Sequence, residues 1–205
     1  MTQRGTLYTI SAPSGAGKTS LVAALLDKKS NLQVSISHTT RPKRPGESDG
    51  VNYHFVSKTQ FQTMLSQRAF LEHAEVFDNN YGTSAQWVDE TLASGCDVIL
   101  EIDWQGAAQI HRQLPETVSI FVLPPSKNTL LERLTQRGQD GPEVIAQRIA
   151  EAQAEMTHFT EADYLIINDV FATALDELAL IINSGKLLRK KQQYQHQTLI
   201  KELLL

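Results

Sequence analysis

Ala12-Pro13-Ser14-Gly15-Ala16-Gly17-Lys18-Thr19 is the stretch of sequence that decides the fold. It lies between an apolar run at Leu7–Ser11, which predicts a buried strand, and an amphipathic run at Lys18–Leu26, which predicts a helix. The glycines let the backbone wrap an anion without Cβ clashes, and the N–H groups at the start of the helix face that anion. Strand, glycine-rich turn and helix in this order predict a phosphate loop.

Two side chains of this loop suit a nucleoside triphosphate. Lys18 can reach the β- and γ-phosphates, and the hydroxyl of Thr19 can hold Mg²⁺. The strict G-x-x-x-x-G-K-[ST] pattern fails at its first position, which is Ala12. A dinucleotide-binding turn is the weaker interpretation, because Ser20 stands where its third glycine would be. A tight turn with a solvated lysine is the other alternative.

Composition indicates an ordinary globular protein. The chain has 205 residues, is 41% hydrophobic and 20% charged, and carries a formal net charge of -4. This predicts one domain and gives no indication of DNA or RNA binding. The single cysteine, Cys96, is interpreted as a small buried side chain and favours a reducing compartment, with the cytoplasm as the expected location. No apolar run is long enough to predict a membrane span or a signal peptide.

Apolar runs alternate with amphipathic stretches along most of the chain. Strands are expected at Leu7–Ser11, 34–37, 97–103, Val118–Leu123 and Tyr164–Ile167, and helices at Lys18–Leu26, 105–112, 128–137 and 173–183. This alternation predicts an α/β fold, with a central parallel sheet between two layers of helices. The stretch from Lys186 onwards is expected to be helical.

Two segments interrupt the alternation. Residues 35–92 hold several prolines and glycines, a short strand at 53–56, a helix at 59–67 opened by a capping box, and a strand at 70–77. They predict a mixed α+β lobe inserted into the core. Residues 133–159 contain a polar, glycine-bearing stretch that is interpreted as a mobile lid, with Pro142 starting a helix. The expected core is therefore 1–34, 93–132 and 160–205.

Further motifs resemble those of the guanylate kinases. They are S-H-T-T-R-P-K-R-P-G-E at 37–47, N-Y-H-F at 52–55, F-L-E-H-A-E at 70–75, N-Y-G-T at 80–83, E-I-D-W-Q-G at 101–106 and the arginine-flanked segment 133–148. They occur in order over nearly the whole chain, so the resemblance is highly specific. It implies a bacterial-type enzyme that transfers the γ-phosphate of ATP to GMP, and to dGMP, with Mg²⁺ as cofactor.

The acceptor phosphate is expected to meet a cluster of donors. Arg41 and Arg44 lie in a proline-rich loop and can clamp a dianionic phosphate through paired hydrogen bonds. Tyr53 and Tyr81 can add hydroxyl donors. The resemblance implies that all four contact the phosphate of GMP. Taken without the surrounding motif, the two arginines would be interpreted as solvated surface groups.

Recognition of the base is expected to depend on one carboxylate. Guanine presents N1–H and an exocyclic amine, and a carboxylate accepts from both, whereas adenine would leave it unpaired. The resemblance assigns this role to Glu72 and places Ser37, Gly82 and Thr83 at the same site. Without the resemblance, Glu72 would be interpreted as an exposed residue.

Glu101 and Asp103 follow a buried run, at the edge where α/β sheets present their ligands. Their spacing on a strand would point both carboxylates to the same side. The resemblance places them near GMP and the metal, and Thr19 and Asp103 are the expected Mg²⁺ residues, with water as an intermediary for the carboxylate. Capping of the next helix by Asp103 is the alternative.

Arginines flank the expected lid. A cation that arrives on closure can neutralise charge on the transferred phosphoryl group. Arg137 and Arg148 are expected to contact phosphate, whereas Arg133 contacts ATP or forms a salt bridge on its helix. The resemblance also places Asn168-Asp169 beside the adenine, although Val170 follows where many members carry another acid. The residues expected to act in catalysis are Lys18, Arg41, Arg137 and Arg148.

Two other functions are kept as alternatives. One is a phosphate-loop kinase with a different acceptor. The other is a guanylate-kinase-like module that binds phosphorylated peptides without catalysis, although such modules have degraded phosphate loops. The sequence leaves the formation of a homo-oligomer open.

Overall fold

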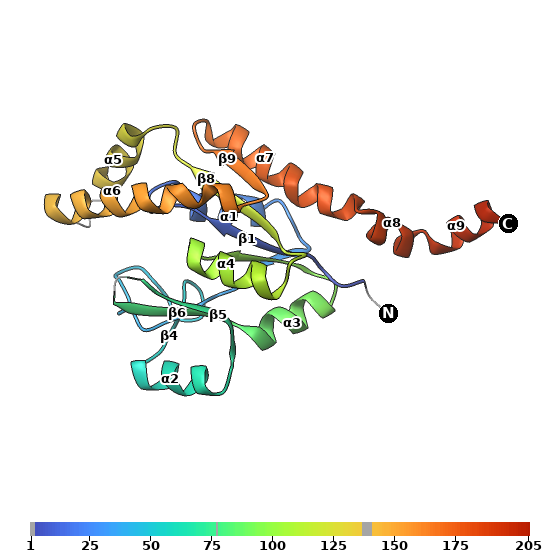
Figure 1. The fold of residues 1–205 in the computed structure, drawn as a ribbon, viewed down its shortest axis with the longest axis horizontal. Coiled ribbons are helices and arrows are strands. Elements are labelled where there is room, and N and C mark those ends of the chain that lie inside the picture. The colour runs from blue at the N-terminus through green and yellow to red at the C-terminus, as the bar shows by residue number, and fades with distance from the viewer. Residues whose placement is uncertain (1–2, 77, 137–140) are drawn as a thin grey trace.

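The computed structural model describes residues 3–76, 78–136 and 141–205. Its central sheet has five strands in the order β2-β7-β1-β8-β9, and all of their pairings are parallel. The strands are β1 (Leu7–Ser11), β2 (Leu32–Val34), β7 (Asp97–Glu101), β8 (Val118–Leu123) and β9 (Tyr164–Ile167). The expected parallel sheet is therefore confirmed (Figure 1).

Helices cover the two faces of this sheet with separate apolar cores. α1 (Lys18–Leu26) and α7 (Phe171–Ser184) pack on one face. The strand side chains that they bury are Tyr8, Ile10, Ile99, Ile120, Val122 and Ile166. α3 (Ala85–Ala93) and α4 (Trp104–Gln113) pack on the opposite face against Leu7, Val98 and Leu100. The expected three-layer fold is confirmed.

A second, four-stranded sheet lies below the core in Figure 1. Its order is β4-β3-β6-β5, and it is mixed, because β3 pairs parallel with β4 and antiparallel with β6. The strands are β3 (His38–Thr39), β4 (His54–Phe55), β5 (Phe70–Val76) and β6 (Asn79–Ser84). α2 (Lys58–Ser66) packs here through Phe61, whose ring stacks on Phe70 at 4.6 Å. The expected capping box, Ser57 with Gln60, opens this helix.

Two helical segments complete the described chain. α5 (Lys127–Gln136) and α6 (Pro142–Met156) pack on each other, and η1 (Thr157–Glu161) returns the chain to β9. After α7, the chain forms η2 (Gly185–Leu187), α8 (Arg189–Gln195) and α9 (Gln197–Leu204), which extend away from the body (Figure 1). Among the described residues, no helix combines the length and apolar character that crossing a bilayer requires.

Several expected elements need correction. The strand expected at 34–37 is wrong: β2 ends at Val34, and the next strand, β3, belongs to the other sheet. The strand expected at 97–103 ends at Glu101, because Asp103 already caps α4. β6, α3 and the full length of α6 were not expected. Cys96 is buried, as expected. The division into core, lobe and lid stays a prediction.

Candidate functional site

The turn between β1 and α1 has the backbone of an anion cradle. Gly15 and Gly17 both have φ of 92°, in the left-handed region that favours glycine. A Cβ on Gly15 would lie 2.9 Å from the side chain of Leu130, and one on Gly17 would lie 2.3 Å from the amide nitrogen of Asn168. Both glycines are therefore required by conformation and by close packing, as the sequence predicts for a phosphate loop.

Two polar side chains bind the backbone of this loop. Asn168 is buried, and its Nδ2 donates to the carbonyl of Ala16 at 2.7 Å. The guanidinium of Arg133 donates to the carbonyls of Ala16, at 3.4 Å, and Asn168, at 3.0 Å. The structure thus places Arg133 and Asn168 against the backbone of the loop, where they position it. Asp169, expected beside the adenine, is exposed.

Substitution of Asn168 tests this support. Asn168→Ala removes a buried donor and leaves the Ala16 carbonyl with one partner fewer, so we expect a loss of about 1–3 kcal/mol in the free energy of unfolding. We also expect the KM for ATP to rise more than the KM for GMP. Asn31→Ala is the matched control, because the Asn31 amide also donates to a carbonyl, that of Gly95, but at an exposed site. Equal effects of both variants in denaturant titration and steady-state kinetics would contradict the role.

Lys18 and Thr19 begin α1 and both reach the carboxyl end of β7. The Nζ of Lys18 donates to the carbonyl of Ile102 at 3.1 Å, and burial lowers the pKa of Lys18, against the opposing pull of Glu101 and Asp103. The hydroxyl of Thr19 donates to a carboxylate oxygen of Glu101 at 2.9 Å. The ammonium of Lys18, the hydroxyl of Thr19 and the carboxylate of Glu101 thus lie together beside the phosphate loop.

Asp103 has a different position from the one expected. It lies beyond the strand, and its carboxylate accepts from the backbone N–H of Gly106 at 2.8 Å as the N-cap of α4. The alternative interpretation, helix capping, is therefore confirmed, although the carboxylates of Glu101 and Asp103 both lie close enough to Lys18 to oppose the lowering of its pKa. The structure pairs Thr19 with Glu101 instead of Asp103. Hydroxyl and carboxylate oxygens are ligands that Mg²⁺ prefers, so Thr19 and Glu101 fit such an ion.

Glu155 is a site residue that the sequence analysis missed. It lies near the end of α6 and borders a small cavity together with Ala12 and Asp103. Burial raises the pKa of Glu155, and the nearby Lys18 and a hydrogen bond from the backbone N–H of Ser14 oppose that rise. A carboxylate therefore already contacts the loop that is shaped for an anion. Nothing in the local sequence distinguishes Glu155 from other acids on an amphipathic helix.

The inserted lobe expected to hold the acceptor, residues 35–92, gathers an arginine and two tyrosines. The guanidinium of Arg41 pairs with both carboxylate oxygens of Glu47, at 2.7 and 3.1 Å, and this contact raises its pKa. Arg41 also lies 5.3 Å from the ring centre of Tyr53, whose ring meets that of Tyr81 edge-on at 5.9 Å. Arg44 is exposed, and its backbone N–H donates to Glu47 at 2.8 Å. Glu47 therefore occupies the paired N–H donors of the Arg41 guanidinium.

Glu72 lies on β5 of this acceptor lobe, at the point where the lobe meets α4. It is only 3% exposed, and one of its oxygens accepts from the hydroxyl of Thr83 at 2.5 Å. Burial raises the pKa of Glu72 to about 7. A Cβ on Gly106 would lie 2.7 Å from the other oxygen, so the close approach of α4 requires this glycine. The interpretation of Glu72 as an exposed residue is wrong.

The other expected residues are distributed as follows. Ser37 is half-buried beside β3, and its carbonyl accepts from the backbone N–H of His54 at 2.9 Å. Gly82 is buried, and a Cβ there would contact the ring of Phe70 at 2.9 Å, so packing alone demands glycine. Arg148 is half-buried on α6. Arg137 lies outside the described residues.

Known proteins show strong similarity to this chain. A family model described as guanylate kinase matches residues 4–185. A guanylate kinase from Saccharophagus degradans is 62% identical and one from Alcanivorax borkumensis 56% identical, each over 100% of this chain and 100% or 99% of the relative. The crystal structure of guanylate kinase from Anaplasma phagocytophilum is 30% identical and superposes with a TM-score of 0.75, covering 95% of this chain and 96% of that one.

Proposed function

Because the chain belongs to the guanylate kinase family, whose members transfer the γ-phosphate of ATP to GMP, we propose specific roles for its residues in that reaction. The chain is itself an ATP:GMP phosphotransferase. The observation that carries the assignment of the acceptor site is Glu72, a carboxylate buried where the lobe meets α4 and already accepting from Thr83. No observation favours the peptide-binding alternative.

On the donor side, the phosphate loop holds ATP. The backbone of residues 12–19 surrounds the β- and γ-phosphates, and Lys18 places its charge on them. Lys18 is poised for this because the group to which its Nζ donates is a neutral carbonyl, that of Ile102. Thr19 and Glu101 would hold Mg²⁺, which neutralises phosphate charge when it is bound. Arg133 and Asn168 act indirectly, by positioning the loop through Ala16.

On the acceptor side, Arg41 changes partner. In the structure two N–H groups of its guanidinium donate to the carboxylate of Glu47. A phosphate offers the same pair of oxygens and carries more negative charge than a carboxylate. GMP would therefore displace Glu47 and join Arg41 to Arg44. The rings of Tyr53 and Tyr81 lie against each other and beside Arg41, and we assign their hydroxyls to the same phosphate.

Glu72 reads the base. Its ionised form accepts from the N1–H and the amine of guanine, while Thr83 and Ser37 add polar contacts. Adenine offers an acceptor at N1, so binding AMP would leave a buried carboxylate unpaired. Asp103 supports this site by fixing the start of α4, which packs against Glu72 through Gly106.

The lid supplies the remaining charge. Arg148 on α6, and Arg137 shortly before it in the sequence, are proposed to contact the transferred phosphoryl group when the lid closes. Closure also excludes water, which would otherwise hydrolyse ATP. In-line transfer needs no covalent intermediate, so positioning and charge neutralisation account for the catalysis.

The acceptor range and the cellular setting follow from the same residues. The absent 2′-hydroxyl of dGMP is remote from the base edge that Glu72 reads, so dGMP is a proposed second acceptor. The buried single thiol of Cys96 suits a reducing compartment, and we propose the cytoplasm.

An acceptor panel tests the proposal. We expect ADP release with GMP and dGMP, and a kcat/KM lower by about 10³–10⁴ with AMP, UMP and dTMP, because the wrong base leaves buried polar groups unpaired. A coupled ADP-release assay with ATP in excess measures this. A preference for any acceptor other than GMP or dGMP would reject the roles assigned to Glu72 and Thr83.

A further inference from the structure

Glu155 brings a negative charge to a loop that is shaped for an anion. It lies in the last turn of α6, is half-buried, and borders a small cavity together with Ala12 and Asp103. Its carboxylate accepts a hydrogen bond from the backbone N–H of Ser14 and attracts the nearby Lys18. Because like charges repel, a carboxylate at this place disfavours the binding of phosphate groups. The binding of ATP therefore does not explain why the chain places an acid here.

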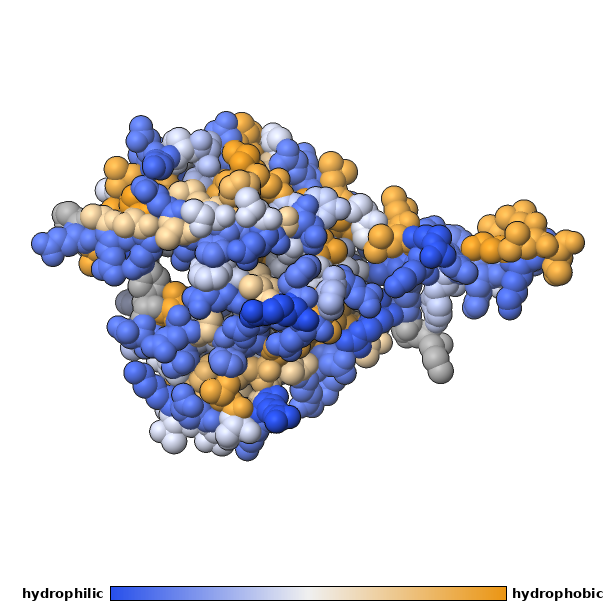
Figure 2. Space-filling model, in the orientation of Figure 1, coloured by the Kyte–Doolittle hydropathy of each residue, from blue (hydrophilic) through white to orange (hydrophobic). Residues whose placement is uncertain are grey.

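The position of Glu155 on α6 relates it to Arg148. The two residues are seven apart, which is close to two full turns, so their side chains leave the same side of the helix about 10 Å apart along its axis. Next to this side runs the stripe of apolar residues that packs on α5, namely Ile145, Ile149, Ala152 and Met156. Elsewhere the visible surface of α6 carries hydrophilic and weakly apolar residues (Figure 2). A contact at Glu155 therefore also fixes the direction in which Arg148 leaves the helix.

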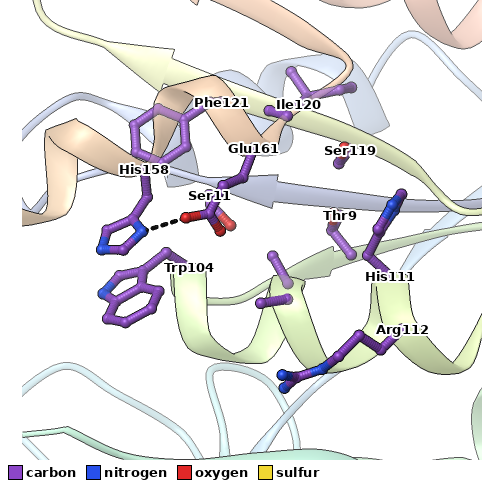
Figure 3. A pocket seen from close by; sticks show the side chains of 13 residues that line it. Thr9, Ser11, Trp104, His111, Arg112, Ser119, Ile120, Phe121, His158 and Glu161 are labelled. Atoms are coloured by element: carbon purple, nitrogen blue, oxygen red, sulfur yellow. Dashed lines mark hydrogen bonds and ion pairs between the residues drawn. The ribbon is translucent and has the colours of Figure 1, made fainter.

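A second contact fixes the segment that follows α6. His158 of η1 stacks on Trp104, the first residue of α4, with 3.6 Å between the ring centres and 6° between the ring planes. The Nδ1 of His158 forms a hydrogen bond of 2.6 Å with Glu161 (Figure 3). Beyond the stack, a cavity of about 350 Å³ lies between α4 and η1, so packing there is incomplete. Specific polar and ring contacts therefore hold the end of α6 on the core, and that of Glu155 reaches the phosphate loop.

Small rotations of α6 would move Arg148 by distances that matter for phosphate transfer. The side chains of an α-helix end about 5–6 Å from its axis, so a rotation of about 10° displaces such a group by about 1 Å. A misplacement of this size can lower a rate by about 10²-fold. Glu155 lies on the same side of the helix as Arg148, so its contact with Ser14 opposes this rotation.

We propose that Glu155 is a positioning residue for phosphate transfer, which holds the end of α6 on the phosphate loop and so directs Arg148 at the transferred phosphoryl group. The inference rests on the role proposed above for Arg148. Glu155 takes no part in the chemistry and raises kcat through the orientation of α6. Its negative charge weakens the binding of ATP, and this effect separates its role from that of a group that binds phosphate.

Substitution of Glu155 tests the proposal, because it should affect kcat and the binding of ATP differently. For Glu155→Ala we expect kcat to fall by about 10–10²-fold, while the KM for ATP stays equal or falls. Glu155→Gln should recover part of kcat, because the amide oxygen can still accept from Ser14. Glu143→Ala, at an exposed position in the first turn of α6, is the matched control and should have wild-type kinetics. A loss of kcat/KM that comes entirely from a higher KM for ATP would overturn the proposal.

A double substitution shows whether Glu155 acts through Arg148. Alanine favours the helical conformation, so the variants should keep α6, and circular dichroism checks that each is folded. Arg148→Ala should lower kcat by about 10³-fold, and Glu155→Ala should then have little further effect, since the group that it positions is absent. Equal losses in both backgrounds would contradict positioning through Arg148. Wild-type kcat in Arg148→Ala would reject the role of Arg148 and this inference with it, whereas wild-type kcat in Glu155→Ala alone would overturn only the inference.

Discussion

Replacing Lys18 by methionine should abolish phosphate transfer while leaving the fold intact. Lys18 is the cation at the start of α1, beside the cradle formed by Gly15 and Gly17. Without it, charge on the transferred phosphoryl group loses a fixed counter-charge, and we expect kcat to fall by about 10³-fold or more. Single-turnover measurement of ADP formation quantifies the loss.

Stability distinguishes this role from a structural one. The pKa of Lys18 is lowered by burial, so the folded state disfavours the charged side chain at neutral pH. Methionine removes that unfavourable charge and keeps most of the volume, but it also removes the cation beside Glu155, so the melting temperature should stay close to that of the wild type. Lys28→Met is the control, because Lys28 is exposed in its pair with Asp176 and should affect neither quantity. A variant that loses activity only because it unfolds would contradict the assignment.

We expect Glu72→Gln to weaken the recognition of guanine much more than it affects the binding of ATP. A glutamine amide accepts from one guanine donor and directs its own N–H groups at the other. We expect kcat/KM for GMP to fall by about 10³–10⁴-fold, while the KM for ATP stays within a few-fold. Glu75→Gln is the matched control, since Glu75 lies on the same strand with its side chain exposed. Equal kinetics in the two variants would remove Glu72 from base recognition.

The same variant has a predictable effect on the pH dependence of stability. The pKa of Glu72 is about 7 when folded, against an ordinary value of 4.5, so the folded state binds the proton more tightly. Its contribution to the free energy of unfolding therefore falls as the pH rises from 4.5 to about 7. A glutamine side chain does not titrate, so Glu72→Gln should gain about 2–4 kcal/mol relative to wild type between pH 4.5 and about pH 8. Urea titrations at both pH values measure this gain, and a constant difference would contradict the raised pKa.

The elements predicted well from sequence are those with a strong local signal. Leu7–Ser11, Lys18–Leu26, Val118–Leu123 and Tyr164–Ile167 have the expected bounds. Leu7–Ser11 and Val118–Leu123 are buried parallel strands with mostly apolar side chains, the loop after Leu7–Ser11 is rich in glycine, and the apolar run at Tyr164–Ile167 predicts a strand although most of its side chains are exposed. The short strands of the acceptor lobe were harder to predict, because pairing partners decide them. His38–Thr39 is a strand because His54–Phe55 pairs with it on one side and Tyr81–Gly82 on the other.

The motifs identified which residues belong to the site but not how they are held. Asp103 was placed on a strand and instead caps α4, because the chain turns immediately after Ile102. Asn168 was expected beside the adenine, and Arg133 was expected to contact ATP or to form a salt bridge on its helix; their contacts with the carbonyl of Ala16 were not expected. Glu155 was missed altogether. Ala16 lies more than a hundred residues from Arg133 and Asn168 in the sequence, so no local pattern reports these contacts.

The sequence alone determined the chemistry of this protein, because the phosphate loop, the acceptor motif and their spacing are local and each residue type carries its own reactivity. Tertiary structure decided the environment of those residues. Burial between β5 and α4 raises the pKa of Glu72. The amide of Asn168 binds the carbonyl of Ala16 and leaves no room for a Cβ at position 17, so Gly17 is required there. Burial and close approach depend on what the rest of the chain brings near, and these are properties that only the folded chain possesses.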